Sequence, residues 1–320
     1  MDLDILLPIH RVDNYLRLAL TSINNSKGIS FRLIIIDDRS DKSEKLYPLV
    51  KDFDNLEIIE TAGNRGYGFA LEAGSASVES KAVALANSDD LIDEYKYLKQ
   101  LTLLEKNEIV LTNIRRINMA GKPSTSLTGS INCDEYTPSF LLLGSYGADA
   151  SWCMTTAWWK KYSFFDDKDF LDWRIAMSSF GKSKIGFINE DLYFYRRHPM
   201  QISIKNRKVN SVDPSIFRDW EKFARILGMQ KISIEMFNFF AIPWAKNTTI
   251  NYEEAIEFTY SLRDITRNQS IAIQKQIDRL IQRRFLLQLG NENLSLSDRF
   301  RVIIDNYSGI KNLMLDIVKN

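Results

Sequence analysis

Two short apolar runs that each end in acidic residues constrain the fold of this chain more than any other feature. Ile34–Ile36 leads directly into Asp37 and Asp38, and Val83–Ala86 leads into the Asn-Ser-Asp-Asp segment at 87–90. A continuous apolar run of this length predicts a strand buried on both faces of a mostly parallel sheet. The acids would emerge at the C-terminal edge of the sheet, where open α/β sheets bind ligands. Two acidic tips at one edge indicate a nucleotide and a divalent metal, because hard cations take oxygen ligands and ribose hydroxyls need acceptors.

Strand-like and helix-like segments alternate along the first part of the chain. We expect strands at residues 3–7, 31–36, 56–59, 83–86, 108–112 and 184–188, and helices between them, including one at 43–51 and one beginning near residue 91. Such alternation predicts right-handed βαβ crossovers and an α/β fold with a parallel sheet. From about residue 213 the pattern is helical. A polar, basic linker at 205–212 divides a domain at 1–205 from a helical domain at 206–320.

Composition excludes several classes of partner. Lys and Arg total 42 and Asp and Glu total 41, so no net field recruits nucleic acid or an anionic membrane. Cys133 and Cys153 have no paired spacing and predict free thiols in a reducing compartment, with a bridge between them as the open alternative. The start lacks a basic signal region, and the longest apolar stretches are shorter than the roughly 20 residues that span a bilayer. We therefore expect a cytoplasmic protein whose membrane contact, if there is any, is peripheral.

A glycine-rich segment at 63–68 precedes a helix that is rich in small residues. Glycine lets the backbone approach a ligand closely, and a helix N-terminus beside it offers free N–H groups to phosphate. The alternative is a tight turn with close packing of the helix. Asp13 or Asn14 is expected to cap the first helix.

The order of these segments resembles glycosyltransferase family 2, the inverting enzymes of the GT-A fold. The matching segments are residues 5–10, 36–40, 64–66, 87–90, 171–173 and 195–203, within roughly the first 205 residues. The resemblance implies a GT-A type, Rossmann-like sheet and transfer of a sugar from a nucleoside diphosphate, with a UDP-sugar favoured. It further implies a glycan or lipid-linked glycan acceptor, a role in bacterial surface polysaccharide synthesis, and Mn²⁺ or Mg²⁺ as cofactor.

The resemblance also assigns the donor site. Asp38 would accept a hydrogen bond from the nucleobase, whereas the alternative is that Asp37 and Asp38 only cap the following turn. The remaining residues expected to bind the nucleotide sugar are Pro8, Ile9, His10, Asn64, Arg65, Gly66, Asn87, Ser88 and Arg197.

The segment at 87–90 occupies the place of the family's Asp-x-Asp metal motif. Asp89 is expected to bind the metal together with the diphosphate, with Asp90 as the competing candidate. Asn87 replaces the first aspartate, so metal affinity without nucleotide should be weak. His198 would ligate the metal or contact the diphosphate. The alternative is that Ser88 or Asp89 caps the helix that follows.

Asp172 is the candidate general base. It matches the second acid of the family's Glu-Asp pair, in which Leu171 here replaces the glutamate, and the acids at 166, 167 and 169 are alternatives. Partial burial beside Trp173 would disfavour the charged carboxylate and raise its basicity. A purely structural role at the N-terminus of a helix is the other interpretation.

Further residues are open to two interpretations. Trp152 and Trp158, with Trp159 nearby, would either stack on acceptor sugars or form core. The C-terminal helices predict packing surfaces for a homo-oligomer or a membrane-proximal partner. Two rival functions remain: a phospho-receiver-like regulatory module, and a catalytically inactive sugar-nucleotide-binding protein, which Asn87 and Leu171 would suit.

Overall fold

The computed structural model divides the chain into two compact units. The first comprises Met1–Asp134 and Tyr146–Gln201, and the second comprises Glu135–Ser145 and Ile202–Asn320. The structure describes residues 1–40, 43–63, 66–123, 130–131, 138–143, 149–162, 171–201, 214–230, 232–242, 250–269 and 271–289. The boundary predicted at residue 205 lies outside the described residues and stays a prediction.

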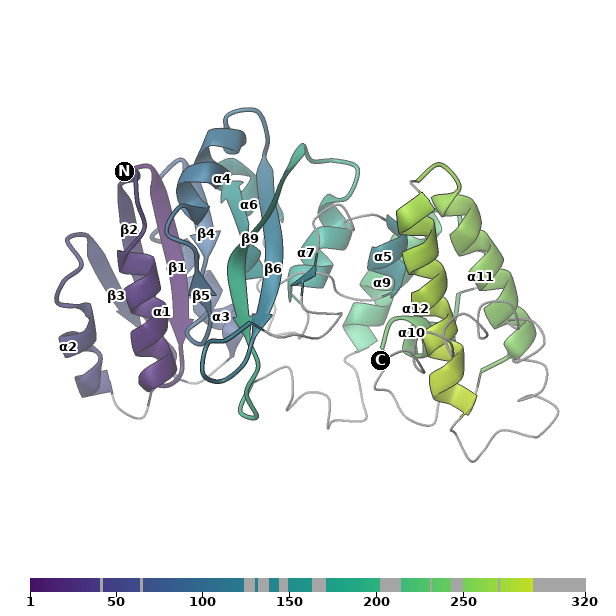
Figure 1. The fold of residues 1–320 in the computed structure, drawn as a ribbon, viewed down its shortest axis with the longest axis horizontal. Helices are drawn as coiled ribbons and strands as arrows, with labels where there is room; N and C mark the ends of the chain where they lie inside the picture. The colour runs from purple at the N-terminus through teal and green to yellow at the C-terminus, as the bar shows by residue number, and fades with distance from the viewer. Residues whose placement is uncertain are drawn as a thin grey trace. The chain divides into compact units, whose positions relative to one another are not determined.

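One half of the sheet in the first unit is parallel, as the apolar runs predict. Its strands stand in the order β3-β2-β1-β4, and each neighbouring pair is parallel (Figure 1). Both faces are covered, because the whole of residues 33–36 in β2 is inaccessible to solvent. The bounds are β1 (Leu3–Ile9), β2 (Phe31–Asp37), β3 (Leu56–Glu60) and β4 (Ala82–Leu85).

The other half of the sheet is mixed. After β4 the order continues β8-β6-β9-β5, with β7 paired to β6. β8 is antiparallel to both β4 and β6, whereas β6 and β9 are parallel, with an irregular register around Asn113. β9 extends far beyond the predicted strand at 184–188. The bounds are β5 (Leu91–Ile92), β6 (Ile109–Ile117), β7 (Ser130–Ile131), β8 (Trp152–Thr155) and β9 (Ile185–Arg196).

The direction of β8 determines which residues lie beside the C-terminal end of β4. Ala84 of β4 stands opposite Cys153 of β8, and Cys153 is a free, buried thiol. Because the two strands are antiparallel, the residues that follow β4 and the residues that precede β8 come to the same edge. The short helix η3 (Asp149–Ser151) is therefore placed beside the acidic segment at 87–90.

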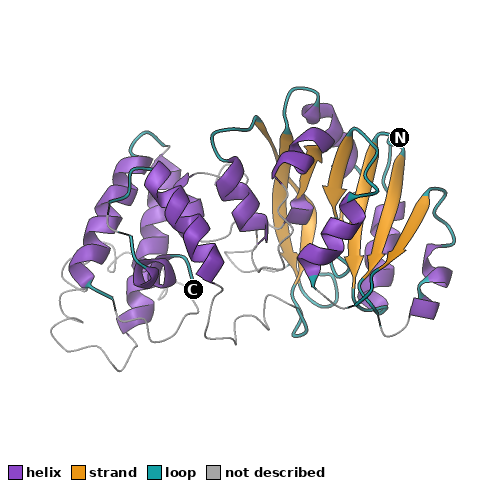
Figure 2. Cartoon of the chain, turned by 180° about the vertical axis from the view of Figure 1, so that it is seen from behind, coloured by secondary structure: helices purple, strands orange, loops and turns teal. Residues whose placement is uncertain are grey.

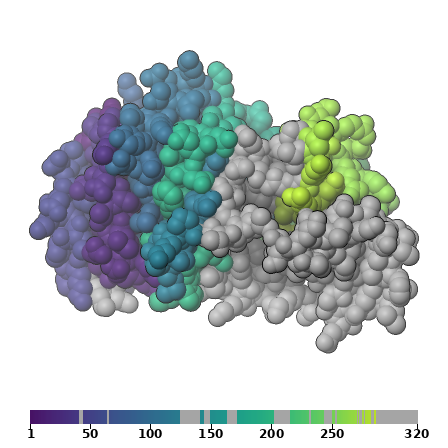
Figure 3. Space-filling view, viewed as in Figure 1, coloured from purple at the N-terminus to yellow at the C-terminus, as the bar shows by residue number. Residues whose placement is uncertain are grey.

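Helices lie on both faces of the sheet (Figure 2), and in the space-filling view the segments coloured as α1 and α4 form part of the surface over it (Figure 3). Asp13 caps α1, since its carboxylate accepts hydrogen bonds from the N–H groups of Tyr15 and Leu16. A Cβ at Gly74 would lie 2.7 Å from Ile36 Cδ1, so α3 needs glycine to pack this closely. The helix bounds are α1 (Asn14–Asn24), α3 (Tyr67–Ser75), α4 (Lys96–Leu104), α6 (Thr156–Tyr162) and α7 (Leu171–Ser179).

Two expected helices differ from the prediction. The helix expected at 43–51 is a 3-10 turn, η1 (Ser43–Lys45), followed by the single-turn helix α2 (Tyr47–Val50). Pro48 explains the break, because proline has no N–H to donate to a preceding turn. The helix expected near residue 91 begins at Lys96, since 91–92 form β5. The alternative that Ser88 or Asp89 caps it is therefore wrong.

A buried ion pair closes the opposite end of β1. Asp4 is fully buried, and its carboxylate accepts hydrogen bonds from Arg32 Nε and Nη2 at 3.1 and 3.0 Å. The N–H groups of Glu79 and Ser80 donate to it at 2.7 and 2.9 Å. Burial raises the pKa of Asp4, but these hydrogen bonds outweigh it and hold the pKa below its usual value. The pair fixes β2 and the segment before β4 to β1.

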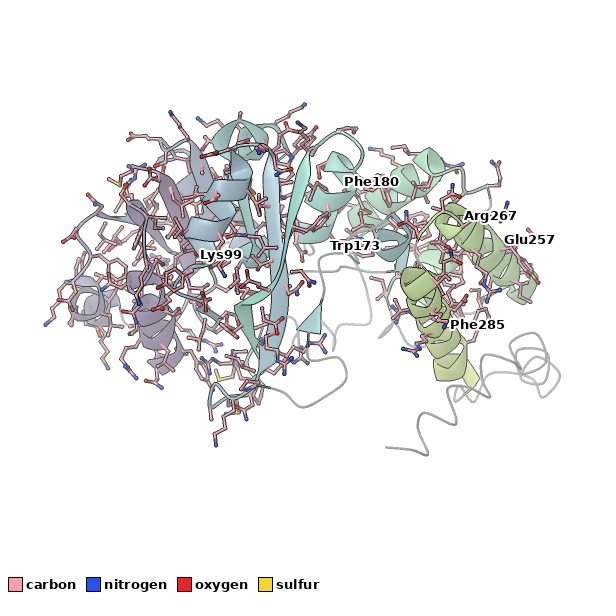
Figure 4. The ribbon with its side chains drawn as sticks, turned by 45° about the horizontal axis from the view of Figure 1, so that its top comes forward. Lys99, Trp173, Phe180, Glu257, Arg267 and Phe285 are labelled. Carbon is pink, nitrogen blue, oxygen red and sulfur yellow. The ribbon has the colours of Figure 1, made fainter. Side chains whose placement is uncertain are left out.

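The second unit is helical, as predicted, and its core is aromatic. Trp220 lies 5.3 Å from Phe237 and 5.9 Å from Phe258 between ring centroids, and Phe240 lies 6.3 Å from Phe285, which Figure 4 labels on α12. Among the described residues, no helix is both long and apolar enough to cross a membrane. The bounds are α5 (Pro138–Leu143), α9 (Pro214–Ile226), α10 (Ile234–Phe240), α11 (Tyr252–Thr266) and α12 (Ile271–Leu289).

Candidate active site

Asp38 joins the end of β1, the turn after β2 and the start of α3. Its carboxylate accepts hydrogen bonds from Thr61 Oγ1 at 2.6 Å and from the Gly66 N–H at 3.0 Å. The Asp38 N–H donates to the Ile9 carbonyl at 2.9 Å, and His10 Nδ1 lies 3.4 Å from the Asp38 carbonyl. The structure therefore brings four predicted donor-site residues together at the C-terminal edge of the sheet.

Asp37, the other acid after β2, stabilises the turn itself. Its carboxylate accepts hydrogen bonds from the Ser40 N–H at 2.6 Å and from Ser40 Oγ at 2.9 Å. Within this turn Arg39 has a φ of 57°, in the left-handed region. The turn-capping interpretation thus holds for Asp37, while the Asp38 carboxylate points to residues on another loop.

The remaining predicted donor residues are placed less fully. Pro8 stands opposite Ile36 in the parallel register of β1 and β2. Ser88 is half-buried in the turn that follows β4. Asn64 and Arg65 lie outside the described residues, so their roles stay predictions.

Asp90 is buried and bonded to the protein on both oxygens. Oδ1 accepts the Arg196 N–H at 2.6 Å, and Oδ2 accepts the hydroxyl of Tyr193 and Asn87 Nδ2. Asn87 also donates to the Tyr193 hydroxyl at 2.9 Å, so its amide faces inward. Burial, with the charge of Asp89 second, raises the pKa of Asp90 to about 8. Asp90 thus fastens the end of β9 to the end of β4.

Asp89 faces His198 across this junction. Its Oδ2 lies 2.9 Å from His198 Nε2, and its side chain is 29% exposed whereas that of His198 is 7% exposed. The His198 ring lies 4.8 Å from the Tyr15 ring of α1. Carboxylate oxygen and imidazole nitrogen are both suitable donors for Mn²⁺, and Mg²⁺ commonly takes one or two carboxylates together with substrate phosphates. No group of three metal-binding side chains occurs among the described residues. The pair could supply two donors to such a metal, and metal binding here stays a prediction.

Arg196 contacts the backbone of the segment at 87–90, although sequence reasoning assigned Arg197 to the donor. Arg196 is fully buried, and its Nε donates to the Asp89 carbonyl at 2.8 Å. Arg197 is half-buried, and its guanidinium lies 6.0 Å from the Tyr195 ring. Successive side chains of a strand point to opposite faces, so Arg196 and Arg197 point in different directions. The sequence indicates this difference only if the strand is predicted to run to residue 196.

Asp172 lies in the first turn of α7 and is half-buried. Its Oδ1 accepts the N–H of Trp173 at 2.8 Å, consistent with the helix-terminus interpretation. Its charge also reaches the Tyr67 hydroxyl. Burial raises the pKa of Tyr67 well above its usual value, with further contributions from the carboxylates of Asp149, Asp172 and Asp90. Only Asp149 contacts this hydroxyl directly among the described residues, whereas Asp172 and Asp90 act on it through their charges. The alternatives at 166, 167 and 169 lie outside the described residues.

Sequence reasoning missed Asp149 and Tyr67. The Tyr67 hydroxyl donates to Asp149 Oδ2 at 2.8 Å, and burial raises the pKa of Asp149. No apolar run leads directly into Asp149, because the residue stands before an antiparallel strand rather than after a parallel one. The signal that could have identified it is therefore the pairing of β8, which is not local in sequence.

Trp152 and Trp158 are core residues, and their predicted role in acceptor binding is wrong. Each is 1% exposed, so neither ring offers a face on which a sugar can stack. Trp158 Nε1 donates to Ser183 Oγ at 2.7 Å, and Trp159 Nε1 donates to Ser75 Oγ at 2.9 Å. The dense aromatic segment serves to pack α6 against the sheet.

Relatives of known class share parts of this sequence. An uncharacterized glycosyltransferase of Haemophilus influenzae is 29% identical over 113 residues, which are 35% of this chain and 45% of the relative. The O-antigen biosynthesis glycosyltransferase WbnJ of Escherichia coli is 30% identical over 124 residues, which are 38% of this chain and 49% of the relative. The chain spans about half the length of the curated relatives that it matches.

Solved structures share the fold. S. aureus TarS 1-349 in complex with UDP-GlcNAc has a TM-score of 0.59 at 15% identity, covering 97% of this chain and 92% of that one. A longer S. aureus TarS structure has a TM-score of 0.56, covering 96% of this chain and 55% of that one. Residues 4–181 match the family described as Glycosyl transferase family 2, and this segment contains Asp38, Asp89 and Asp172. A match over more than half of the chain, on a fold of this type, shows that the chain belongs to glycosyl transferase family 2.

Proposed function

We propose that this protein is an inverting glycosyltransferase that moves a sugar from a nucleoside diphosphate, with UDP favoured, to a glycan or lipid-linked glycan. The single observation that carries the proposal is that the Asp38 loop, after β2, and the Asp89–His198 pair, after β4, lie at the same edge of the sheet. Tyr67 follows Gly66, whose N–H bonds Asp38, and its hydroxyl donates to Asp149 beside the segment at 87–90. The structure of TarS with UDP-GlcNAc supports a nucleotide-sugar donor for a protein of this fold.

Each part has one chemical role in this proposal. Asp38 accepts a hydrogen bond from the nucleobase, beside Ile9 and His10. Asp89 and His198 hold Mn²⁺ or Mg²⁺ together with the diphosphate oxygens, and a metal there would neutralise charge on the leaving group. Asp172 removes the proton from the acceptor hydroxyl, whose oxygen attacks the anomeric carbon from the face opposite the diphosphate. Inversion follows from this single displacement.

The setting of the reaction is proposed from the relatives. One of them is named for O-antigen biosynthesis, which supports a role in the synthesis of a surface polysaccharide. A cytoplasmic location, peripheral membrane association through a lipid-linked acceptor, and oligomerisation through the C-terminal helices belong to the same proposal. The phospho-receiver alternative does not account for the family match over residues 4–181.

Nucleotide binding is tested by thermal unfolding with UDP, dTDP, GDP and CMP sugars, with and without Mn²⁺. We expect one nucleoside diphosphate sugar to raise the melting temperature, because a ligand of the folded state stabilises it. The Asp89→Ala variant should lose the part of the shift that depends on Mn²⁺. Lys99→Met, on the exposed side of α4, is the matched control and should keep the full shift. No shift with any donor contradicts the proposal.

Catalysis is tested separately with Asp172→Asn. This variant should bind the donor as the wild type does and lose transfer by about 10²- to 10⁴-fold, the usual contribution of a general base. Transfer at the wild-type rate would remove Asp172 from this role. The inactive-protein alternative, which the inward-facing amide of Asn87 favours, predicts donor binding without turnover in the wild type as well.

A further inference from the structure

Asp149 lies at the same edge of the sheet as the proposed donor site, but no sequence motif identifies it. It begins η3, directly before β8, and β8 pairs antiparallel with β4. Asp149 therefore stands beside the segment at 87–90, although it lies about 60 residues further along the chain. The residue is 7% exposed, so it is neither a surface acid nor completely sealed.

The carboxylate of Asp149 is held in one orientation by two donors. The Tyr67 hydroxyl donates to Oδ2 at 2.8 Å, and the Ala150 N–H donates to Oδ1 at 2.8 Å. An ionised carboxylate offers about four lone-pair positions, so one donor on each oxygen leaves room for further hydrogen bonds. Among the described residues, none of the ion pairs that the structure forms includes Asp149. Within the described part of the chain, the donors that orient Asp149 are a hydroxyl group and a backbone N–H rather than a cation.

The proposed reaction indicates which part of the nucleotide sugar would lie next to Asp149. In an inverting displacement, the acceptor oxygen and the leaving diphosphate stand on opposite sides of the anomeric carbon. The transferred sugar therefore lies between Asp172 and the Asp89–His198 pair. Asp149 begins η3 at the edge where the residues after β4 also lie, and its partner Tyr67 directly follows Gly66, which bonds Asp38. Asp149 therefore lies beside both parts of the proposed donor site.

Charge decides which part of the donor Asp149 can bind. A carboxylate repels a diphosphate, but it accepts strong hydrogen bonds from neutral hydroxyl groups. We propose that Asp149, oriented by Tyr67, binds hydroxyl groups of the sugar that is transferred and so contributes to donor selection. The inference rests on the proposed function, since it requires a nucleotide sugar in this site. Asp149 is then a substrate-binding residue, and Tyr67 is a positioning residue that acts through it.

The test compares binding of the nucleotide with binding of the nucleotide sugar. Dissociation constants are measured by calorimetry for UDP and for whichever of UDP-GlcNAc, UDP-glucose and UDP-galactose binds the wild type most tightly. We expect Asp149→Ala to weaken binding of the UDP-sugar by about ten- to a hundredfold, as for the loss of hydrogen bonds to a charged group, and to leave UDP unchanged. A merely structural role would weaken both ligands by the same factor.

Two more variants keep the result decisive. Asp149→Asn preserves the shape of the side chain and replaces Asp149→Ala if the latter fails to fold by thermal unfolding. Tyr67→Phe removes only the hydroxyl, and it should weaken UDP-sugar binding by about three- to tenfold with UDP again unchanged. Combined with Asp149→Asn, it should add nothing further, because both changes remove one interaction.

The outcomes separate this inference from the proposed function. Binding of UDP and of a UDP-sugar to the wild type, with their ratio unchanged in both Asp149 variants, overturns the role of Asp149 and leaves the proposed function standing. Failure of the wild type to bind UDP or any of the three UDP-sugars contradicts the proposed donor and overturns the inference with it.

Discussion

Replacing Lys96 by Met is expected to stabilise this protein strongly at slightly acidic pH. Lys96 is the first residue of α4 and is 0% exposed. Its Nζ has no hydrogen-bond partner among the described residues and lies 4.2 Å from the centroid of the Tyr97 ring. Burial lowers the pKa of Lys96 to about 7, and only the nearby Cys153 opposes that shift. Met has a similar length and carries no charge, so it should fill the same space.

The magnitude follows from the difference in pKa between the folded and the unfolded chain. The usual pKa of lysine is 10.5, and a fall to about 7 corresponds to roughly 5 kcal/mol at 1.36 kcal/mol per pH unit. Between these two pH values the unfolded chain binds a proton that the folded chain does not, so wild-type stability rises with pH. Below pH 7 both states are charged and the full cost persists. Lys96→Met should therefore gain up to about 5 kcal/mol at pH 6 and little above pH 10.

Urea denaturation at pH 6, 8.5 and 10, followed by tryptophan fluorescence, measures this gain. Lys99→Met is the matched control on the same helix, because Lys99 Nζ pairs with Glu190 at 2.5 Å and its side chain is 39% exposed (Figure 4). A surface pair of this kind contributes at most about 1 kcal/mol, so the control should change little. The reasoning is refuted if Lys96→Met is no more stable than the wild type at pH 6, or if its advantage is the same at pH 10.

Two further substitutions test the backbone at Gly66 in the candidate site and the Asp4–Arg32 ion pair at the opposite end of β1. Gly66 has a φ of +97° and no atom within 4 Å of an added Cβ, so Gly66→Ala should cost about 1–3 kcal/mol through backbone strain alone and weaken UDP binding. Gly228→Ala, at a φ of +84° in the second unit, should show a comparable cost in urea without affecting UDP. Asp4→Asn removes the carboxylate that pairs with Arg32 at 3.0 Å, while Glu57 and Glu79 remain at 3.4 and 3.5 Å, and it should cost about 1–3 kcal/mol at pH 7. Since the folded pKa of Asp4 is lowered, the wild type loses this advantage as pH falls below about 4 through that folded pKa. A difference that persists unchanged in acid unfolding would contradict the assignment.

Local sequence predicts the parallel half of the sheet because each of its strands is a short, nearly continuous apolar run. Residues 33–36 are apolar without interruption and fully buried, and the acid that follows them, Asp38, lies where the topology rule places it. The same rule finds Asp89 after β4. These residues could be predicted because strand, burial and edge position all follow from a few neighbouring residues.

The mixed half of the sheet depends on pairing between distant segments, and there the prediction fails. Nothing in residues 152–155 shows that this strand runs against β4, so Trp152 is taken for a ligand contact and Asp149 is missed. Likewise, the irregular register of β6 and β9 around Asn113 sets which way the end of β9 turns. That register places Arg196, rather than Arg197, against the backbone carbonyl of Asp89.

The two adjacent acids after β4 have opposite tasks, and each task depends on the other. Asp90 directs both oxygens into the protein, where they hold the end of β9, and this places the His198 loop against Asp89. Asp89 keeps a partly exposed carboxylate beside His198, while Asp90 makes the contacts to the end of β9. This arrangement places two carboxylates next to each other. Burial and the charge of Asp89 raise the pKa of Asp90 to about 8, and a nearby positive charge would reduce the repulsion between the two. In the proposed function, a metal bound together with a diphosphate would reduce this repulsion at the partly exposed member, Asp89.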